Sequence, residues 1–93
     1  MNNKTLKINN SDNIVVALTN LKKNDIVKVN NKEYVLLNDI KAKHKFSIQN
    51  IETGEPIYMY GVVVGKAKKN IAIGEKINLL NIVHQTENYS VPK

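Results

Sequence analysis

Ile51-Glu52-Thr53-Gly54-Glu55-Pro56-Ile57 and Ile71-Ala72-Ile73-Gly74-Glu75-Lys76-Ile77 share one seven-residue form, I-x-x-G-E-x-I, called here the turn phrase. Its first isoleucine suits a buried position, and its glycine suits a turn position with positive φ. Its second isoleucine follows the acid by two places, where the next inward-facing residue of a strand belongs. The turn phrase therefore predicts a tight turn that leads directly into a short strand.

Two further segments keep the spacing of the turn phrase with other residues. Leu21–Val27 has Asn-Asp in place of Gly-Glu, and Ile40–Phe46 has Lys43 and His44 at those two places. Four such turns in 93 residues predict a mainly β fold of short strands and tight turns, with at most one or two short helices. The chain is too short for a solenoid, whose stacked units would each need about 20 to 50 residues.

The composition also favours strands. Ile and Val supply 21 residues and Ala only four, and β-branched residues favour strands over helices. We predict strands at Ile26–Val29, Lys32–Leu37, Lys45–Ile48, Pro56–Tyr60, Val62–Val64 and Lys76–Leu80.

One segment, Asn13–Leu21, has a helical pattern. Its apolar residues recur at helical spacing, and Asp12 or Ser11 could cap its first turn. We predict a short helix or turn here. The run Asn13–Val16 fits a strand equally well, so that alternative stays open.

The length allows one domain, which we expect to span residues 1–93 with polar tails at 1–8 and about 85–93. There are no cysteines, which excludes a disulfide scaffold and thiolate chemistry. No apolar run approaches the roughly 20 residues that a membrane span needs. The first residues have no apolar core of a secretory signal, so we expect a cytoplasmic protein without a membrane partner.

The net charge of +6 comes from 14 lysines and no arginine. Arginine is the residue of bidentate phosphate and guanine recognition. The chain also has 15 asparagines and 11 isoleucines, a pattern typical of an AT-rich coding sequence. We therefore interpret the charge as compositional and expect no nucleic-acid partner.

The cluster Lys41–Lys45 contains the residues best suited to chemistry. His44 could act as a base or a ligand, and Lys45 could pair with a carboxylate of a substrate or a partner. The alternative is that His44 only fills the place of the acid in a surface turn. His84 lies 40 residues away and fits no metal-ligand spacing, so we expect no metal site in this chain.

The segment Asn9–Leu18, followed by Leu21, resembles the opening of the altronate and galactarate dehydratase family, which reads roughly D-N-V-A-V-A-L. Further matches follow in the family's order over residues 9–82, and they are Asp39-Ile40, His44-Lys45-Phe46, Ile51, Gly54-Glu55-Pro56-Ile57, Tyr60-Gly61, Gly65, Ala67, Ile71, Gly74-Glu75 and Asn81. The resemblance implies an SAF domain with a β-clip fold.

The same resemblance implies a function. The chain would be the small subunit of a sugar-acid hydro-lyase, inactive alone and bound to a large catalytic subunit. His44 and Lys45 would be catalytic, and Lys45 and Asn81 would bind the sugar acid. This chain would hold no cofactor, and a divalent iron or manganese ion would lie on the large subunit.

Two departures from the family pattern support other interpretations. Lys43 replaces a glycine before the His-Lys pair, and residues 78–81 read Asn-Leu-Leu-Asn where the family has H-x-H-N. The missing histidines favour a noncatalytic SAF binding or assembly module. The small subunit of a sulfolactate sulfo-lyase, which is similar in layout, is a further alternative.

Overall fold

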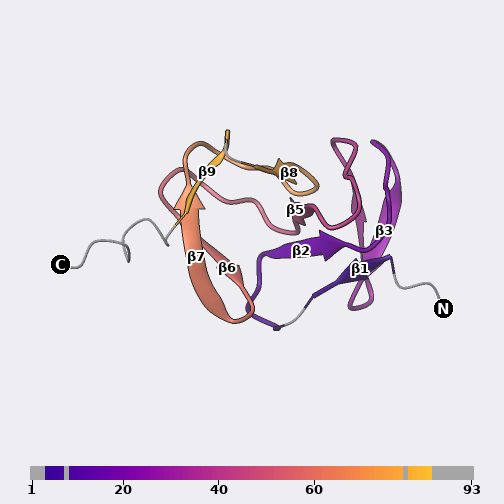
Figure 1. Cartoon of the computed structure of the whole chain (residues 1–93), viewed down its shortest axis with the longest axis horizontal. Helices are drawn as coiled ribbons and strands as arrows, with labels where there is room; N and C mark the ends of the chain where they lie inside the picture. Colours follow the sequence, from indigo (N-terminus) through magenta and orange to yellow (C-terminus); the bar gives the residue numbers. More distant parts are fainter. Residues whose placement is uncertain (1–3, 8, 79, 85–93) are drawn as a thin grey trace.

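The computed structural model describes residues 4–7, 9–78 and 80–84, and over these residues the chain forms strands and turns without a helix. This confirms the mainly β prediction (Figure 1). The strands are β1 (Thr5–Leu6), β2 (Ile14–Ala17), β3 (Ile26–Val29), β4 (Lys32–Val35), β5 (Lys45–Ser47), β6 (Pro56–Met59), β7 (Val62–Ala67), β8 (Lys76–Ile77) and β9 (Ile82–His84).

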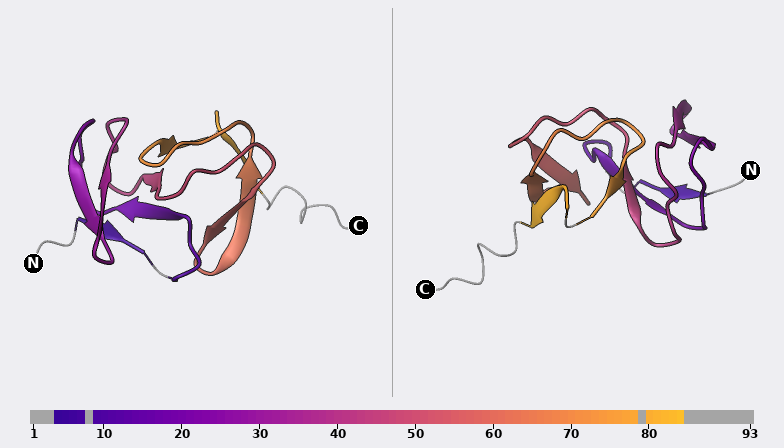
Figure 2. Two further views of the ribbon diagram at one scale, coloured as in Figure 1. Left: turned by 180° about the vertical axis from the view of Figure 1, so that it is seen from behind. Right: turned by 90° about the horizontal axis from the view of Figure 1, so that it is seen from above.

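These strands form three antiparallel sheets. One has the order β1-β2-β5-β8, the second is the β3–β4 hairpin, and the third has the order β6-β7-β9. The β3–β4 hairpin and the β6-β7-β9 sheet lie at opposite ends of the molecule, with β2 and β5 between them (Figures 1 and 2).

Two hydrophobic clusters lie on either side of β2, because its successive side chains point to opposite faces. Ile14 belongs to one cluster, and Val15 and Ala17 belong to the other. The first cluster comprises Ile14, Ile51, Ile57, Met59, Ala67, Ile71, Ile77 and Ile82, and the second comprises Val15, Ala17, Leu21, Val27, Val29, Leu36, Ile40 and Phe46. A strand covered on both faces needs a near-continuous apolar run, which the Ile-Val-Val-Ala sequence of β2 provides.

All four turn phrases form the predicted turns. Their fourth residues have positive φ, at 76° for Asn24, 73° for Lys43, 88° for Gly54 and 87° for Gly74. A strand follows each turn, as predicted. The phrases also pair with one another, since their first residues form two antiparallel bridges, Leu21 with Ile40 and Ile51 with Ile71.

Each turn closes on one buried residue from another part of the chain. The N–H of the fourth phrase residue donates to the carbonyl of that closing residue, whose own N–H donates to the carbonyl of the fifth phrase residue. The sets are Asn24 and Asp25 with Leu36, Lys43 and His44 with Ala17, Gly54 and Glu55 with Ala67, and Gly74 and Glu75 with Ser47. Four turns are thus held by the same pair of hydrogen bonds.

The residue before each phrase supplies a further bond that the sequence analysis did not predict. Asn70 Oδ1 accepts from the Thr53 N–H at 2.9 Å, and Asn50 Oδ1 accepts from the Ile73 N–H at 3.1 Å. Asp39 and Asn20 do the same for the N–H groups of Lys23 and Ala42 in the other pair of phrases. The signal was present in the sequence, because Asn or Asp precedes all four phrases.

The bonding pattern repeats with a spacing of about thirty residues. Ala17 and Ser47 close two of the turns from equivalent places on β2 and β5. β5 also pairs with β2 on one side and with β8 on the other. The molecule therefore contains two similar units that share β5.

The helix expected over Asn13–Leu21 is wrong, and the alternative strand is the one observed. The β-branched residues of β2 pair with β1 and β5 instead of forming a helical turn. Asp12 does not cap a helix. Its buried carboxylate accepts from the N–H groups of Asn9, Tyr60 and Gly61 at 2.8–3.1 Å, and so holds the turn between β6 and β7.

Strand boundaries differ from the predictions at several ends. The segments expected at Lys32–Leu37 and Lys76–Leu80 end at Val35 and Ile77, and β7 extends to Ala67. β1 and β9 were not predicted, and β1 lies in a segment expected to be a polar tail. The other expected tail, at residues 85–93, lies outside the described residues.

Candidate functional site

A pocket of about 460 Å³ lies where the four-stranded sheet meets the β6-β7-β9 sheet. Six residues from six different strands and three residues from the adjoining turns form its walls. They are Ile14, His44, Lys45, Met59, Tyr60, Val64, Ile77, Asn78 and Ile82. The two residues predicted to be catalytic, His44 and Lys45, thus lie at one pocket.

Lys45 occupies a position on β5 that would suit an apolar residue. Its neighbours across the sheet are Val16 on β2 and Ile77 on β8, and both contribute to the first hydrophobic cluster. Lys45 is half-buried, whereas the next residue, Phe46, is fully buried in the second cluster. A lysine in this setting packs its aliphatic stem on apolar neighbours and keeps its ammonium group at the water boundary.

His44 stands in the turn where the other three phrases have an acid. In those phrases Asp25, Glu55 and Glu75 each accept the N–H of the second phrase residue at 2.9 Å. His44 is exposed and is one of the residues that line the pocket. The replacement of the acid by histidine thus supplies the pocket with a group that can transfer protons. The catalytic roles of His44 and Lys45 remain predictions.

Asn81 is hydrogen-bonded to the pocket residue Asn78 and is not itself one of the lining residues. It is 3% exposed, its Oδ1 accepts from the Asn78 N–H at 2.9 Å, and its Nδ2 donates to the Lys76 carbonyl at 2.7 Å. Nδ2 also lies 3.3 Å from a carboxylate oxygen of Glu75. In the structure, Asn81 shapes the turn that carries Asn78.

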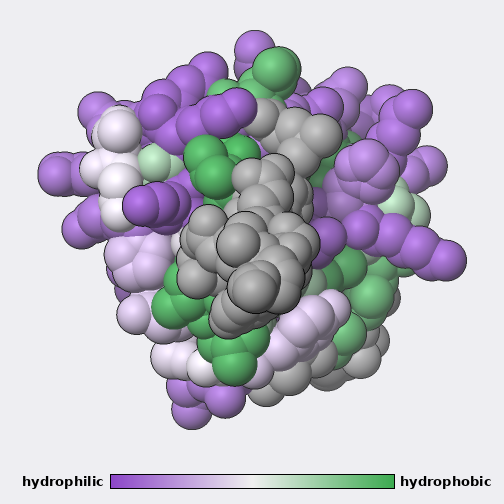
Figure 3. Space-filling view, turned by 60° about the vertical axis from the view of Figure 1, so that its left-hand side comes forward, coloured by the Kyte–Doolittle hydropathy of each residue, from purple (hydrophilic) through white to green (hydrophobic). Residues whose placement is uncertain are grey.

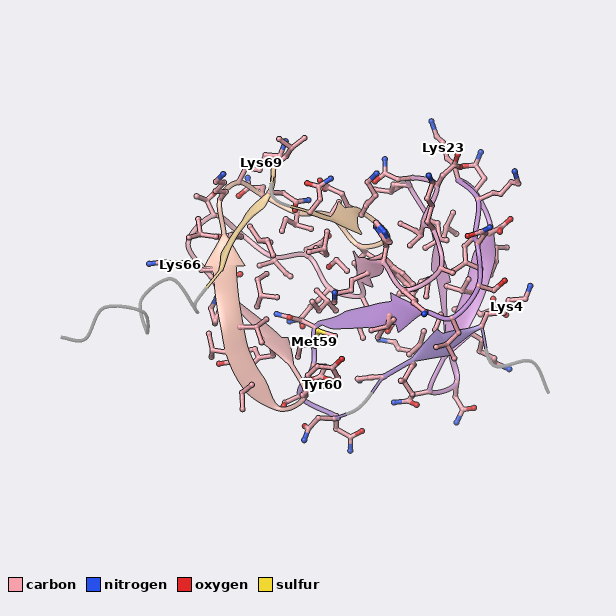
Figure 4. All side chains as sticks on the ribbon, viewed as in Figure 1. Lys4, Lys23, Met59, Tyr60, Lys66 and Lys69 are labelled. Atoms are coloured by element: carbon pink, nitrogen blue, oxygen red, sulfur yellow. The ribbon has the colours of Figure 1, made fainter. Side chains whose placement is uncertain are left out.

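Sequence reasoning did not select Asn78 or Tyr60 as pocket residues. Asn78 stands at the first histidine of the family's H-x-H-N pattern, which was a usable signal. Tyr60 is the last residue of the predicted strand Pro56–Tyr60. It follows β6 in the turn that Asp12 holds, and it lies beside Met59 (Figure 4).

The charge at the pocket is positive. None of its nine lining residues, all in the described part of the chain, is a carboxylate, while Lys45 and His44 are basic. The lysines labelled in Figure 4, Lys4, Lys23, Lys66 and Lys69, lie at the periphery of the molecule. A small anion would therefore find the Lys45 ammonium and the His44 imidazole at the same opening.

Metal-ligand clusters are absent from the described residues, where no three His, Cys, Asp or Glu side chains come together. Nor does the described part of the chain contain a helix able to cross a lipid bilayer. The His84 side chain lies outside the described part, and only its place in β9 is defined.

The fold and the pocket define a small β domain with two basic residues and no carboxylate at its pocket. The family model of the altronate/galactarate dehydratase SAF domain matches residues 3–85. The chain belongs to this SAF domain family, which confirms the resemblance seen in the sequence.

Two similar proteins are altronate dehydratases. The protein from Bacillus subtilis (strain 168) is 33% identical over 76 residues, and the one from Escherichia coli (strain K12) is 34% identical over 76 residues. Each match covers 82% of this chain and 15% of the relative. The chain therefore spans about 15% of the length of these relatives.

Proposed function

We propose that this chain is the small subunit of a sugar-acid hydro-lyase related to altronate dehydratase, and that it contributes to substrate binding beside a large catalytic subunit. The observation that carries the proposal is the meeting of His44 and Lys45 at one pocket whose lining contains no carboxylate among the described residues. The membership of the SAF domain family and the altronate dehydratase relatives support the substrate class.

The chemistry of dehydration explains what each residue would do. The reaction removes the proton α to the carboxylate and expels the β-hydroxyl group, which leaves as water after it gains a proton. It needs a base, a positive charge at the carboxylate and an acid for the leaving oxygen. Lys45 supplies the charge at the substrate carboxylate, and His44 assists the proton transfer. Asn81 contributes to binding through Asn78, whose turn it holds.

The large subunit provides what remains. The described residues of this chain form no metal-ligand cluster, and we propose that a divalent iron or manganese ion is held by the large chain. On this proposal the small chain binds a sugar acid but does not dehydrate it alone.

The proposal is tested first by binding. Altronate is titrated into the isotopically labelled chain while the amide and side-chain NMR signals are followed. We expect shifts at His44, Lys45 and Asn78, and roughly five-fold weaker binding for Lys45→Gln. Lys43→Gln is the matched control, because Lys43 lies in the same turn but does not line the pocket. Equal effects of both variants, or no shifts at these three residues, would contradict the proposal.

The second test is activity in the assembled enzyme. His44→Ala and Lys45→Ala are combined with the large dehydratase chain, and altronate dehydration is measured. Loss of rate in both variants, with assembly unchanged, is expected. Wild-type rates in both would leave no catalytic role for this pair.

A noncatalytic binding module is the second candidate, and one observation favours it. Asn78 lines the pocket where the family pattern has a histidine, so the chain lacks one group that could transfer a proton or bind a metal there. This candidate predicts altronate binding by the small chain but full dehydration rates with His44→Ala.

A further inference from the structure

The floor of the pocket is apolar. Ile14, Ile77 and Ile82 contribute from three strands, and Met59 and Val64 contribute from β6 and β7. These five residues belong to the first hydrophobic cluster or pack against it. The floor is therefore the outer layer of a core whose side chains are mostly buried, and it does not carry a set of hydrogen-bonding side chains.

Three exposed apolar residues lie near the residues of this floor or next to other pocket residues. Tyr60 is 55% exposed, Val62 is 57% exposed and Leu80 is 75% exposed. Val62 is the strand partner of Met59, and Leu80 is tied to the pocket residue Asn78 through a 2.8 Å hydrogen bond. On the side of the molecule where β7 lies, hydrophobic surface interrupts a mainly hydrophilic one (Figure 3). Exposed apolar side chains that gather near a pocket favour a protein contact at that place.

A sugar acid alone does not match this floor. Its hydroxyl groups need hydrogen-bond partners, and burying them against apolar atoms is costly. The polar side chains among the lining residues are those of His44, Lys45, Tyr60 and Asn78. The volume of about 460 Å³ lies within the roughly 300–1,000 Å³ of pockets that hold a whole small molecule. There is room for a six-carbon acid at the basic groups and for a second group on the floor.

We propose that the floor holds an apolar side chain, branched aliphatic or aromatic, from the large catalytic chain, so that the substrate site is built by two chains. This inference rests on the proposed function. The side chain would seat on Met59, Val64 and Ile82 and would leave Lys45 and His44 facing the substrate carboxylate. The partner would then remove the apolar floor from water and fix one wall of the site.

The charge of this chain beside the pocket indicates which residues the partner's surface carries around the apolar side chain. Lys41 and Lys43 precede His44 in the chain and are both exposed. The matching surface of the large chain therefore carries acidic residues next to its apolar anchor, since like charges would repel at this contact. The relatives provide the scale of that partner, because about 85% of their length lies outside the matched part.

The experiment separates the two halves of the pocket with three small probes. These are 4-methylpentanoate, with an apolar body and a carboxylate; 4-methylpentanamide, with the body alone; and altronate, with the carboxylate and hydroxyl groups. The methyl NMR signals of Met59, Ile77 and Ile82 report on the floor, and the signals of His44 and Lys45 report on the rim. The full chain is used at probe concentrations in the millimolar range.

We expect 4-methylpentanoate to shift both sets of signals and the amide to shift the floor alone, with roughly five-fold weaker binding. Altronate should shift the rim and leave the floor signals in place. The inference would be overturned if neither 4-methylpentanoate nor 4-methylpentanamide shifted the floor signals. It would also be overturned if altronate shifted the floor signals as much as these two compounds do. Floor shifts without any response of the rim to altronate would support the apolar seat and refute the sugar-acid proposal.

A pair of variants tests the same seat in the assembled enzyme. Val64→Lys places a charge on the floor, whereas Val63→Lys places one on the neighbouring exposed residue of β7, which does not line the pocket. Because Val64 is already partly exposed, the fold should survive in both variants, as unfolding measurements will check. We expect Val64→Lys to weaken binding of the large chain at least ten-fold and Val63→Lys to change it less than two-fold. Equal binding of the two variants refutes the shared site.

Discussion

Gly74 lies directly against Val35, so that a side chain at Gly74 would collide with the carbonyl oxygen of Val35. The N–H of Leu37 also donates to the Gly74 carbonyl at 2.9 Å. These contacts join the fourth turn phrase to the end of β4. Gly54 holds the equivalent place in the third phrase, with a similar positive φ, but no atom lies within 4 Å of a Cβ built there.

The two glycines should therefore respond differently to alanine. Gly54→Ala has only the cost of a positive φ, about 1–2 kcal/mol of the free energy of unfolding. Gly74→Ala adds a backbone collision, and we expect a loss of roughly 3 kcal/mol or more. Urea unfolding of both variants provides the measurement, with Gly54→Ala as the control for φ. If both variants lost the same free energy of unfolding, the backbone at Val35 would have moved away from the new side chain without an energetic cost.

Asp12 should control the order of the pocket through the turn between β6 and β7. Its buried carboxylate accepts three backbone N–H groups, and hydrogen bonds to charged groups contribute about 1.5–3 kcal/mol each. We expect Asp12→Ala to lower the free energy of unfolding by about 3 kcal/mol, allowing for the gain of removing a buried charge. Amide exchange at Tyr60 and Gly61 should accelerate more than exchange in β3. Uniform acceleration would show that Asp12 contributes to global stability without a local role.

His44→Glu should make the second turn more stable and the pocket less able to bind anions. The glutamate would accept the Lys41 N–H, as the acids of the other three phrases accept theirs. We expect a gain of about 0.5–1 kcal/mol in the free energy of unfolding and weaker altronate binding, because a negative charge joins Lys45 at the opening. His44→Gln is the neutral control. A variant that gains stability and keeps full altronate affinity would show that His44 takes no part in binding.

The turns could be predicted from the sequence because the residues that favour each turn are neighbours in the chain. Positive φ at the fourth phrase residue and the strand two places later follow from neighbouring residues alone, and this held even where Lys43 replaced glycine. The bonds from Asn50 and Asn70 were not predicted, because each one reaches across to the other phrase of its pair. The spacing of the phrases along the chain does not show which two phrases pair with each other.

The error over Asn13–Leu21 has a different cause. A strand covered on both faces loses the alternation of apolar and polar residues, so Ile14, Ala17 and Leu21 could match a helical period by chance. The candidate site was predicted in part. His44 and Lys45 are adjacent in sequence and share the pocket, but Tyr60 and Asn78 reach it only when β6 packs beside β2 and β8 pairs with β5.

The shared strand β5 has a consequence for how the chain folds. Each of the two thirty-residue units needs Lys45–Ser47 to complete its sheet, so a fragment cut on either side of this strand lacks one wall. The units should consequently melt together in one cooperative transition. Substitutions at Lys45 or Phe46 should therefore change the stability of both units.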